Sequence, residues 1–229
     1  MVGNSNYLWN VSYYDNRGRA VKNVSQHYKG AGTRTNNYDE ITNVYNFAGE
    51  LKSSVRRHYL LGVESLYVRN DFSYDHMGRA VDTYQKTGNT SATTANSSVL
   101  LSRLVYNEVG QLKNKSLHST NFGSSFVHPL SYTFNERGWL SSQSSTLFTQ
   151  ELKYNEAVSG VTPQYNGNIE RQEWTGGKYY NYVYDGLNRL TSAIANTGNN
   201  EELSNDKMGN ILTLQRKLST AFVDQLSYT

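Results

Sequence analysis

Apolar and polar residues alternate over short runs along the whole chain. Three clear examples are residues 101–106 (LSRLVY), 130–134 (LSYTF) and 179–184 (YYNYVY). Alternation of β-branched or aromatic residues with polar ones is typical of strands that bury one face. No stretch keeps a helical period over three turns. Residues 53–67 come closest, and their β-branched and aromatic content favours strands. The pattern predicts an all-β fold.

A phrase recurs between these runs: an aromatic residue, Asp or Asn, two variable residues, Gly, a polar residue and an aliphatic one. Clear copies begin at Tyr14, Tyr45, Tyr74, Tyr106, Phe134 and Tyr184, and weaker copies lie at 154–156, 165–169 and 205–211. The Asp or Asn positions are 15, 46, 75, 107, 135, 155, 185 and 206, with steps of 31, 29, 32, 28, 20, 30 and 21 residues. Internal repetition of this kind indicates a repeat architecture. The longer steps are expected to contain an inserted loop or an extra strand.

The phrase has the chemistry of a tight hairpin turn. Asp or Asn at the first position can accept hydrogen bonds from the following amides, and Gly three residues later tolerates the positive φ of a type I turn with a bulge. Asn188 replaces Gly in one copy, and Asn is the next-best residue for the left-handed region. The predicted turn residues are Asp15, Gly18, Asn46, Gly49, Asp75, Gly78, Asn107, Gly110, Asn135, Gly138, Asp185, Asn188, Asp206 and Gly209. The turns therefore lie near 15–18, 46–49, 75–78, 107–110, 135–138, 155–167, 185–188 and 206–209.

The positive-φ assignment has consequences for stability. Gly78→Val forces a β-branched residue into positive φ and is expected to be clearly destabilising. Asn188→Gly is expected to be neutral or mildly stabilising for the opposite reason.

Tandem hairpins are expected to join edge to edge in a single repeat domain over residues 1–229. We predict a curved or spiralling antiparallel sheet, either a partial shell or an open barrel. Eight repeats of two strands give about 16 strands, and a separation of about 4.8 Å makes the sheet about 75 Å wide. Such a sheet is too narrow to enclose another folded domain. Its first and last strands would be exposed, and exposed edges invite pairing, so self-association is expected.

The composition fits ordered β structure. The chain has 19 tyrosines, 13% aromatic residues and only two prolines, Pro129 and Pro163. Aromatic content this high argues against disorder. The mean hydropathy is low, at −0.68. A repeat sheet explains this value, because each repeat buries its face only against its neighbours and tyrosine buries a ring while its hydroxyl stays wet.

The charge and composition of the chain argue against several classes of protein. The net charge of +3 and the absence of a clustered basic run argue against nucleic-acid binding. The chain has no cysteine and therefore no disulfide or thiolate metal site. No apolar stretch approaches the roughly 20 residues of a membrane-spanning helix. Residues 1–9 are polar and lack the apolar segment of a signal peptide. The sequence starts and stops amid strand-like residues, so we expect a segment of a longer protein.

Catalytic chemistry finds little support in the sequence. The five histidines are scattered without metal-ligand spacing, so no metal site and no cofactor are predicted. Neither a Gly-x-Ser-x-Gly elbow nor a phosphate-binding glycine loop occurs. The repeated acids Asp15, Asp75, Asp185 and Asp206 alternate with Asn, which can cap a turn but cannot act as a general acid. We therefore predict no catalytic residues and no enzymatic activity.

The phrase resembles the YD repeat of the Rhs family, the bacterial relatives of the teneurin extracellular shell, over nearly the whole chain. The segments that carry the resemblance, which is greatest to Rhs-like proteins of Bacteroidetes, are Thr42–Phe47, Tyr106–Leu112, Tyr132–Leu140, Pro163–Ile169 and above all Tyr184-Asp185-Gly186-Leu187-Asn188-Arg189-Leu190. In that family the hairpins spiral into a hollow shell that often encloses a C-terminal toxin or other effector. The family's C-terminal core motif, with its Asp-Pro and glycine-rich self-cleaving segment, is absent here.

The resemblance implies a non-catalytic structural segment of a shell. Its partners would be the remaining shell repeats and a C-terminal toxin or effector of a longer chain. As part of that chain it would be secreted or displayed at the cell surface.

The alternative is a module that binds a carbohydrate or cell surface through a concave aromatic surface. Rings on such a surface stack on sugars, and the candidates are Trp139, Trp174, Tyr179, Tyr180 and Tyr182. The interpretation we favour for these rings is a cross-strand ladder that stabilises the sheet.

Overall fold

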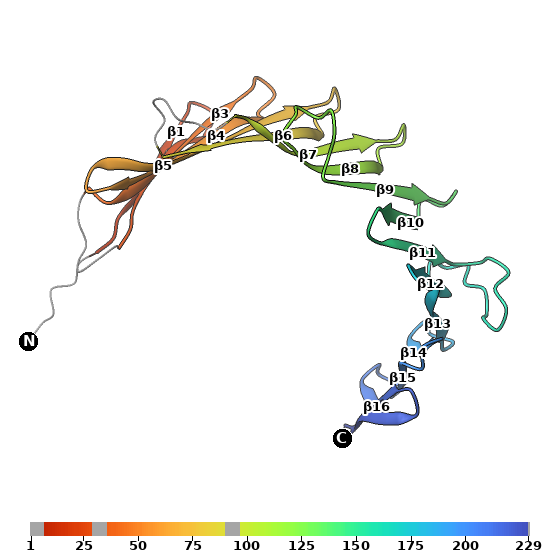
Figure 1. Ribbon diagram of the computed structural model, residues 1–229. Helices are drawn as coiled ribbons and strands as arrows, with labels where there is room; N and C mark the ends of the chain where they lie inside the picture. Colours follow the sequence, from red (N-terminus) through yellow and green to blue (C-terminus); the bar gives the residue numbers. More distant parts are fainter. Residues whose placement is uncertain (1–6, 29–35, 90–96, 229) are drawn as a thin grey trace, which may run out of the picture. The chain divides into compact units, whose positions relative to one another are not determined.

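In the computed structural model, the regular secondary structure of the described residues is entirely β-strand (Figure 1). The structure describes residues 7–28, 36–89 and 97–228. Within these residues it contains 17 strands and no helix, so no helix there is long and apolar enough to cross a membrane. The predicted all-β class is confirmed.

The chain divides into two compact units, Met1–Pro129 and Leu130–Thr229. The first unit holds β1 (Asn10–Tyr14), β2 (Ala20–Gln26), β3 (Tyr38–Tyr45), β4 (Leu51–Leu60), β5 (Val63–Tyr74), β6 (Ala80–Gly88), β7 (Val99–Tyr106) and β8 (Leu112–Ser119). Each of these strands pairs antiparallel with the next one in the chain. The first unit is therefore an antiparallel meander.

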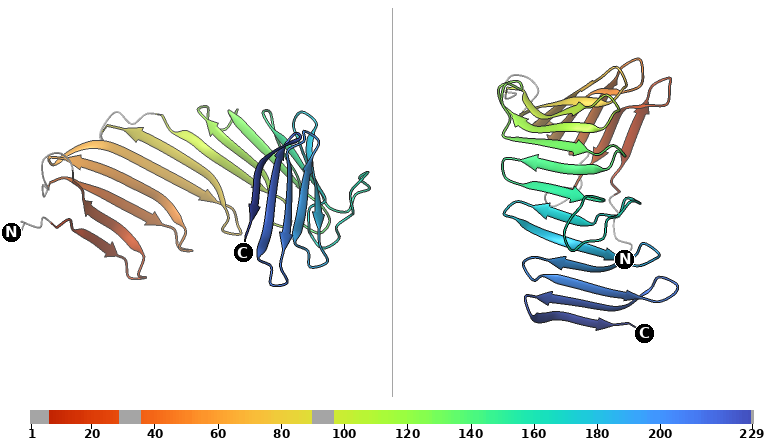
Figure 2. Two further views of the ribbon diagram at one scale, coloured as in Figure 1. Left: turned by 90° about the horizontal axis from the view of Figure 1, so that it is seen from below. Right: turned by 90° about the vertical axis from the view of Figure 1, so that its right-hand side faces the viewer.

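The second unit repeats this organisation. Its strands are β9 (His128–Phe134), which begins at the boundary, β10 (Leu140–Ser145), β11 (Thr149–Lys153), β12 (Arg171–Trp174), β13 (Lys178–Tyr184), β14 (Leu190–Ala195), β15 (Asn200–Asn205), β16 (Ile211–Leu218) and β17 (Ala221–Ser227). Consecutive strands pair antiparallel from β9 to β17. Figure 2 shows the strands of each unit side by side in chain order. The expectation that all repeats form one domain stays a prediction.

Each clear copy of the phrase closes a hairpin with a β-bulge. The register shifts just before the turn, for example between Val44 and Tyr45, and the phrase aromatic then pairs directly with the aliphatic residue, as Tyr45 does with Leu51. The same pairing joins Tyr14 to Ala20, Tyr74 to Ala80, Tyr106 to Leu112, Phe134 to Leu140 and Tyr184 to Leu190. A bulge adds local twist and lets a short turn close the hairpin.

The long and short repeat steps contain the same number of strands. Of the two predicted alternatives, a loop or an extra strand, the described residues contain no extra strand, because each step holds two strands there. The additional length lies partly in the strands themselves: β4 and β5 have 10 and 12 residues, whereas β10 and β11 have 6 and 5. It also lies in connections such as residues 154–170 between β11 and β12, which matches the predicted loop.

Few side chains in the described residues are fully buried. The buried apolar residues are Tyr67, Leu100, Leu152, Tyr154, Ala193 and Ala195. Most other strand residues are half-buried. The low mean hydropathy follows from this arrangement, because no large apolar core has to be filled. Contacts between neighbouring hairpins must therefore contribute much of the stability.

Candidate functional site

The first residue of each turn organises the turn through its side chain. Asp15 Oδ1 accepts hydrogen bonds from the amides of Arg17 and Arg19 at 2.8 and 3.0 Å. Asp75, Asn135, Asp185 and Asp206 accept the same two bonds in their copies. The side chains of Asn46 and Asn107 each accept a hydrogen bond from the backbone amide four residues later.

The fourth residue of the turn has a left-handed backbone. The amide of this residue donates to the carbonyl of the first, as Gly18 does to Asp15 at 3.1 Å. The φ angles of Gly18, Gly49, Gly78, Gly110, Gly138 and Gly209 lie between 76° and 97°, and φ of Asn188 is 61°. The turn residues named from the sequence thus share one geometry.

A second side-chain interaction in the turn escaped the sequence reasoning. The fifth residue complements the first: Arg19, Arg79 and Arg189 donate from Nε to the Oδ2 atom of their Asp partners at 2.7 Å. In two of the three clear copies that begin with Asn, those of Asn46 and Asn107, the fifth residue is Glu50 or Gln111, which accepts from the Asn side-chain amide at 2.5 or 2.9 Å. The third, Asn135, has Trp139 at this position. The signal was visible as covariation between positions four residues apart.

These contacts keep the turn aspartates ionised. The amide of the fifth residue is the main reason that the pKa values of Asp15 and Asp185 are lowered, and the guanidinium adds to it. For Asp75, burial raises the pKa, but the bonds from Arg79 and Met77 together outweigh it. The pKa of Asp206 is lowered mainly by the Asn210 side chain. A carboxyl group held ionised suits a turn acceptor and does not suit a general acid.

In five copies the phrase tyrosine ties its own copy to the preceding one. Its hydroxyl donates to the carbonyl of the aliphatic phrase residue, two positions after Gly, in the copy before it. We call this contact the tyrosine clamp. It joins Tyr45 to Ala20 (3.2 Å), Tyr74 to Leu51 (2.8 Å) and Tyr106 to Ala80 (3.0 Å) in the first unit, and Tyr154 to Leu140 (2.8 Å) and Tyr184 to Ile169 (2.9 Å) in the second. Burial raises the pKa of the Tyr74, Tyr154 and Tyr184 hydroxyls, which keeps them protonated as donors.

The turn arginines reinforce the same junctions. The guanidinium of Arg19 lies 4.8 Å from the ring centre of Tyr45, and that of Arg79 lies 4.4 Å from the ring centre of Tyr106. Arg189 Nη1 also donates to the Asp206 carbonyl of the next turn at 2.7 Å. Each Arg therefore binds its own turn and the following one.

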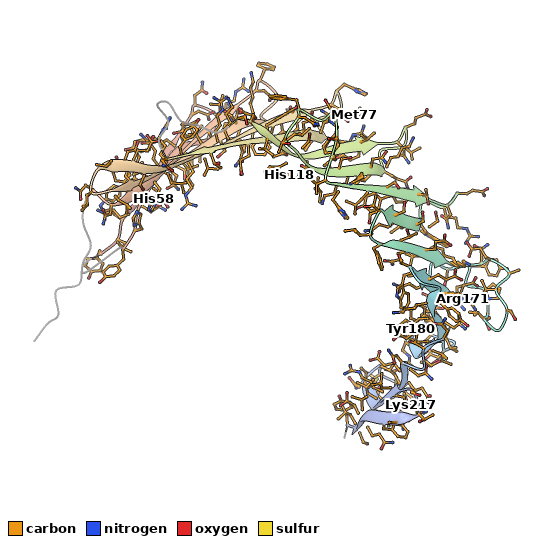
Figure 3. All side chains as sticks on the ribbon, viewed as in Figure 1. His58, Met77, His118, Arg171, Tyr180 and Lys217 are labelled. Carbon is orange, nitrogen blue, oxygen red and sulfur yellow. The ribbon has the colours of Figure 1, made fainter. Side chains whose placement is uncertain are left out.

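Three of the five candidate stacking residues form one row. The rings of Trp174 and Tyr180 lie 5.6 Å apart, and those of Tyr180 and Tyr182 lie 6.2 Å apart. Because strand residues alternate between faces, Tyr179 lies on the opposite face, beneath the guanidinium of Arg171 at 4.2 Å. Figure 3 labels Tyr180 and Arg171. Trp139 belongs to a different contact, packed against Tyr154 at 5.0 Å.

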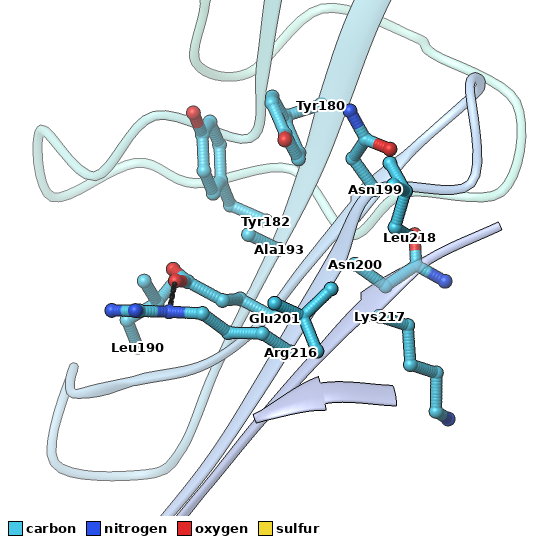
Figure 4. Close-up of a pocket in the computed structure, with 11 residues that line it drawn as sticks. Tyr180, Tyr182, Leu190, Ala193, Asn199, Asn200, Glu201, Arg216, Lys217 and Leu218 are labelled. Atoms are coloured by element: carbon cyan, nitrogen blue, oxygen red, sulfur yellow. Dashed lines mark hydrogen bonds and ion pairs between the residues drawn. The ribbon is translucent and has the colours of Figure 1, made fainter. Parts of the chain in front are cut away.

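The aromatic row borders a pocket of about 430 Å³ within the second unit (Figure 4). A cross-strand row of Tyr182, Ala193, Glu201 and Arg216 runs through it. Because Ala193 is small and its neighbours are large, the row leaves a hollow over β14. Glu201 and Arg216 form an ion pair at 2.5 Å. The other lining residues are Tyr180, Leu190, Asn199, Asn200, Lys217, Leu218 and Val223.

Comparison with known proteins gave matches only among solved structures. No protein-family model and no curated protein matches the chain. The TcdB2-TccC3-TEV structure is similar at 14% identity and a TM-score of 0.31, over 96% of this chain and 16% of that one. The TcdB2-TccC3 structure is similar at 15% identity and a TM-score of 0.29, over 96% and 16%. A Tc holotoxin pore from Photorhabdus luminescens is similar at 14% identity and a TM-score of 0.25, over 91% and 15%. The chain thus spans less than a fifth of the length of these proteins.

Proposed function

We propose that the chain is a non-catalytic wall segment of an Rhs-like YD-repeat shell. Its partners are the remaining repeats of a longer protein, and that protein encloses or presents a C-terminal toxin or effector. The tyrosine clamp carries the proposal, because it uses a residue of the repeated phrase to join one hairpin to the next. The same contact recurs in both units.

Each recurring position of the phrase is explained by its structural role in the proposed wall. The Asp or Asn caps the turn, the Gly or Asn supplies positive φ, and the Arg and Tyr bind the neighbouring copy. None of these positions requires a substrate to account for its chemistry. A secreted or surface location of the longer protein follows from the proposed role.

Protease protection in the full-length natural protein tests enclosure. A C-terminal segment inside a shell should survive protease concentrations that degrade the same segment expressed alone. Denaturing the shell before digestion should remove this protection. Equal rates of cleavage for the enclosed and the isolated segment would overturn enclosure. Sequencing the DNA that flanks the coding region tests for the toxin and immunity genes expected beside such a shell.

The aromatic pocket supports a second candidate function, which is carbohydrate binding. Tyr180 and Tyr182 offer ring faces for the apolar face of a sugar, while Glu201 and Arg216 offer hydrogen-bonding groups for its hydroxyls. Trp174 stacks on Tyr180, so its fluorescence should report a ligand.

A glycan array followed by a fluorescence titration tests this candidate. The titration uses the saccharide that gives the strongest array signal. Saturable quenching should be lost in Tyr180→Ala and kept in Tyr179→Ala, because Tyr179 lies on the opposite face of β13. Trp174→Phe should remove the signal without removing binding on the array. An empty array, or equal loss in the two Tyr variants, would rule the pocket out as a sugar site.

A further inference from the structure

Two histidines and an aspartate from neighbouring strands meet on one face of the first unit. His27 directly follows β2, Asp39 lies in β3 and His58 lies in β4. The register pairs Ser25 with Asp39 and Asp39 with His58, and His27 is two residues from Ser25, so the three side chains share a face. One ligand atom from each residue lies within 4.8 Å of the other two. His58 is labelled in Figure 3.

The repeat architecture brings the histidines together. Each lies twelve residues after the first turn residue of its copy, which is Asp15 for His27 and Asn46 for His58. Equivalent positions of consecutive repeats become neighbours in a stacked scaffold. The two histidines are 31 residues apart, which equals the step from Asp15 to Asn46, so the sequence shows no short metal-ligand spacing between them.

The contacts leave one imidazole nitrogen unsatisfied. His58 Nδ1 lies 2.5 Å from Asp39 Oδ1, and Arg56 donates to Asp39 Oδ2 at 2.6 Å. The His27 ring stacks on that of His58, with centroids 4.4 Å apart. Among the described residues, His27 Nε2 is shielded from solvent and has no hydrogen-bond partner. Burying a polar atom without a hydrogen-bond partner costs free energy, and a ligand bound at this nitrogen would remove that cost.

We propose that His27, Asp39 and His58 form a binding site for a divalent late transition metal, with Zn²⁺ as the first candidate. Two imidazoles and one carboxylate are a donor set that such metals favour. His27 would bind through Nε2, and the metal would replace the proton between His58 Nδ1 and Asp39 Oδ1, which leaves to solvent. Tetrahedral Zn²⁺ with bonds of about 2.1 Å separates its ligand atoms by about 3.4 Å. His58 Nδ1 and Asp39 Oδ1, which lie 2.5 Å apart, would therefore move apart by about 1 Å on metal binding.

A metal at this point would bridge β2, β3 and β4 and thereby two consecutive repeats. It would act at the same kind of junction as the tyrosine clamp. Since it binds only the folded arrangement, it should raise the thermal stability of the chain.

Titration of the whole chain with zinc chloride tests the proposal. Calorimetry should show one saturable site, and the Tm should rise with zinc concentration. His27→Ala and Asp39→Asn each remove a proposed ligand and should weaken binding at least about tenfold, because loss of a residue that only supports a ligand already costs about 10–100-fold in affinity. His76→Ala is the matched control, because His76 is an exposed turn residue remote from the cluster in sequence, and it should bind zinc like the wild type.

Cobalt(II) provides a second measurement that does not depend on stability. The visible absorption of bound cobalt should indicate nitrogen and oxygen ligands in the wild type and should be lost in His27→Gln. Because His27 lies outside the strands, this variant should fold, and circular dichroism can show that it does. Absence of saturable zinc binding, or an equal effect of His76→Ala and His27→Ala, would overturn the proposed site.

Discussion

At the residue scale, backbone conformation rather than available space demands glycine in the turns. Gly18 and Gly78 have nearly the same φ, 76° and 77°. A Cβ at Gly18 would meet no atom within 4 Å, whereas one at Gly78 would lie 2.7 Å from Glu50 Oε1. Gly18→Val and Gly78→Val should each cost about 1–3 kcal/mol in the free energy of unfolding, with the larger loss at Gly78. Chemical denaturation measures both values.

The control for this comparison is Glu50→Ala. In that background the two valine variants should lose the same stability, because the contact that distinguishes them is gone. A Gly78→Val variant as stable as the wild type would show that positive φ is not required there.

The complementary pair at the first and fifth turn positions makes a second residue-scale prediction. Arg79→Glu places a carboxylate beside Asp75 in place of the Arg79 guanidinium, so the Tm should fall. Adding Asp75→Asn recreates the Asn46–Glu50 combination and should restore part of the Tm. Recovery remains partial because Arg79 also stacks on Tyr106. If the double variant were no more stable than Arg79→Glu, the two positions would not act as a pair.

The turn aspartates also predict how stability depends on pH. Asp15, Asp75, Asp185 and Asp206 have lowered pKa values in the folded chain. The unfolded chain therefore binds more protons just below the ordinary Asp pKa of about 3.9. The stabilisation is complete above that value and is lost as pH falls through the lowered values. Thermal melts across the acid range should show a steep fall, and replacing all four residues with Asn should flatten it.

Asn188 illustrates where residue-scale prediction from sequence stops. Its φ of 61° agrees with the left-handed position expected from the turn phrase. However, its Oδ1 accepts a hydrogen bond from Asn166 Nδ2 at 2.6 Å, in a weaker copy of the phrase 22 residues earlier. Asn188→Gly would relieve the backbone but lose this bond. The sequence could reveal the turn but not the partner that the fold brings to it.

At the scale of the elements, the tyrosine clamp should contribute measurably to the junction between hairpins. Tyr154 is 5% exposed and donates to the Leu140 carbonyl at 2.8 Å. Tyr154→Phe keeps the ring and removes the hydroxyl, so it should cost about 0.5–1.5 kcal/mol in the free energy of unfolding. Tyr14→Phe is the matched control, since Tyr14 is 63% exposed and belongs to the first copy. If Tyr154→Phe and the wild type unfold at the same urea concentration, the tyrosine clamp does not stabilise the chain.

Hairpins and their turns could be predicted because the determinants are local. Asp185, Asn188 and the alternating run before them lie within a few residues of one another. The strand content of the longer steps could not be predicted, because extra residues can lengthen strands such as β4 and β5 or form a loop. The neighbours of the candidate aromatic residues could not be predicted either. Alternation alone places Tyr180 and Tyr179 on opposite faces of the strand, but the side chains next to each ring depend on the cross-strand register.

At the scale of the whole molecule, the outer strands determine how the chain can associate, because one edge of each is not paired with another described strand of its unit. β17 pairs only with β16 among the described strands of its own unit, and its Phe222, Val223 and Leu226 are more than 40% exposed. The Tyr228 amide donates to the Leu212 carbonyl of β16 at 2.8 Å. Because consecutive strand residues alternate in direction, the Gln225 amide points away from β16. This edge offers unsatisfied donors and acceptors to a further strand, which in a longer chain would be the next repeat.

We expect the isolated chain to associate through this edge. Gln225→Pro should suppress the association, because it removes an outward N–H while the Leu226 amide stays paired with β16. Gln225→Ala keeps the amide and should associate like the wild type. Sedimentation velocity over a wide concentration range measures the effect, and circular dichroism shows whether the proline variant keeps its strands. A wild-type chain that stays monomeric at the highest concentration would contradict edge pairing. Association that persists in a folded Gln225→Pro variant would instead place the contact on another surface.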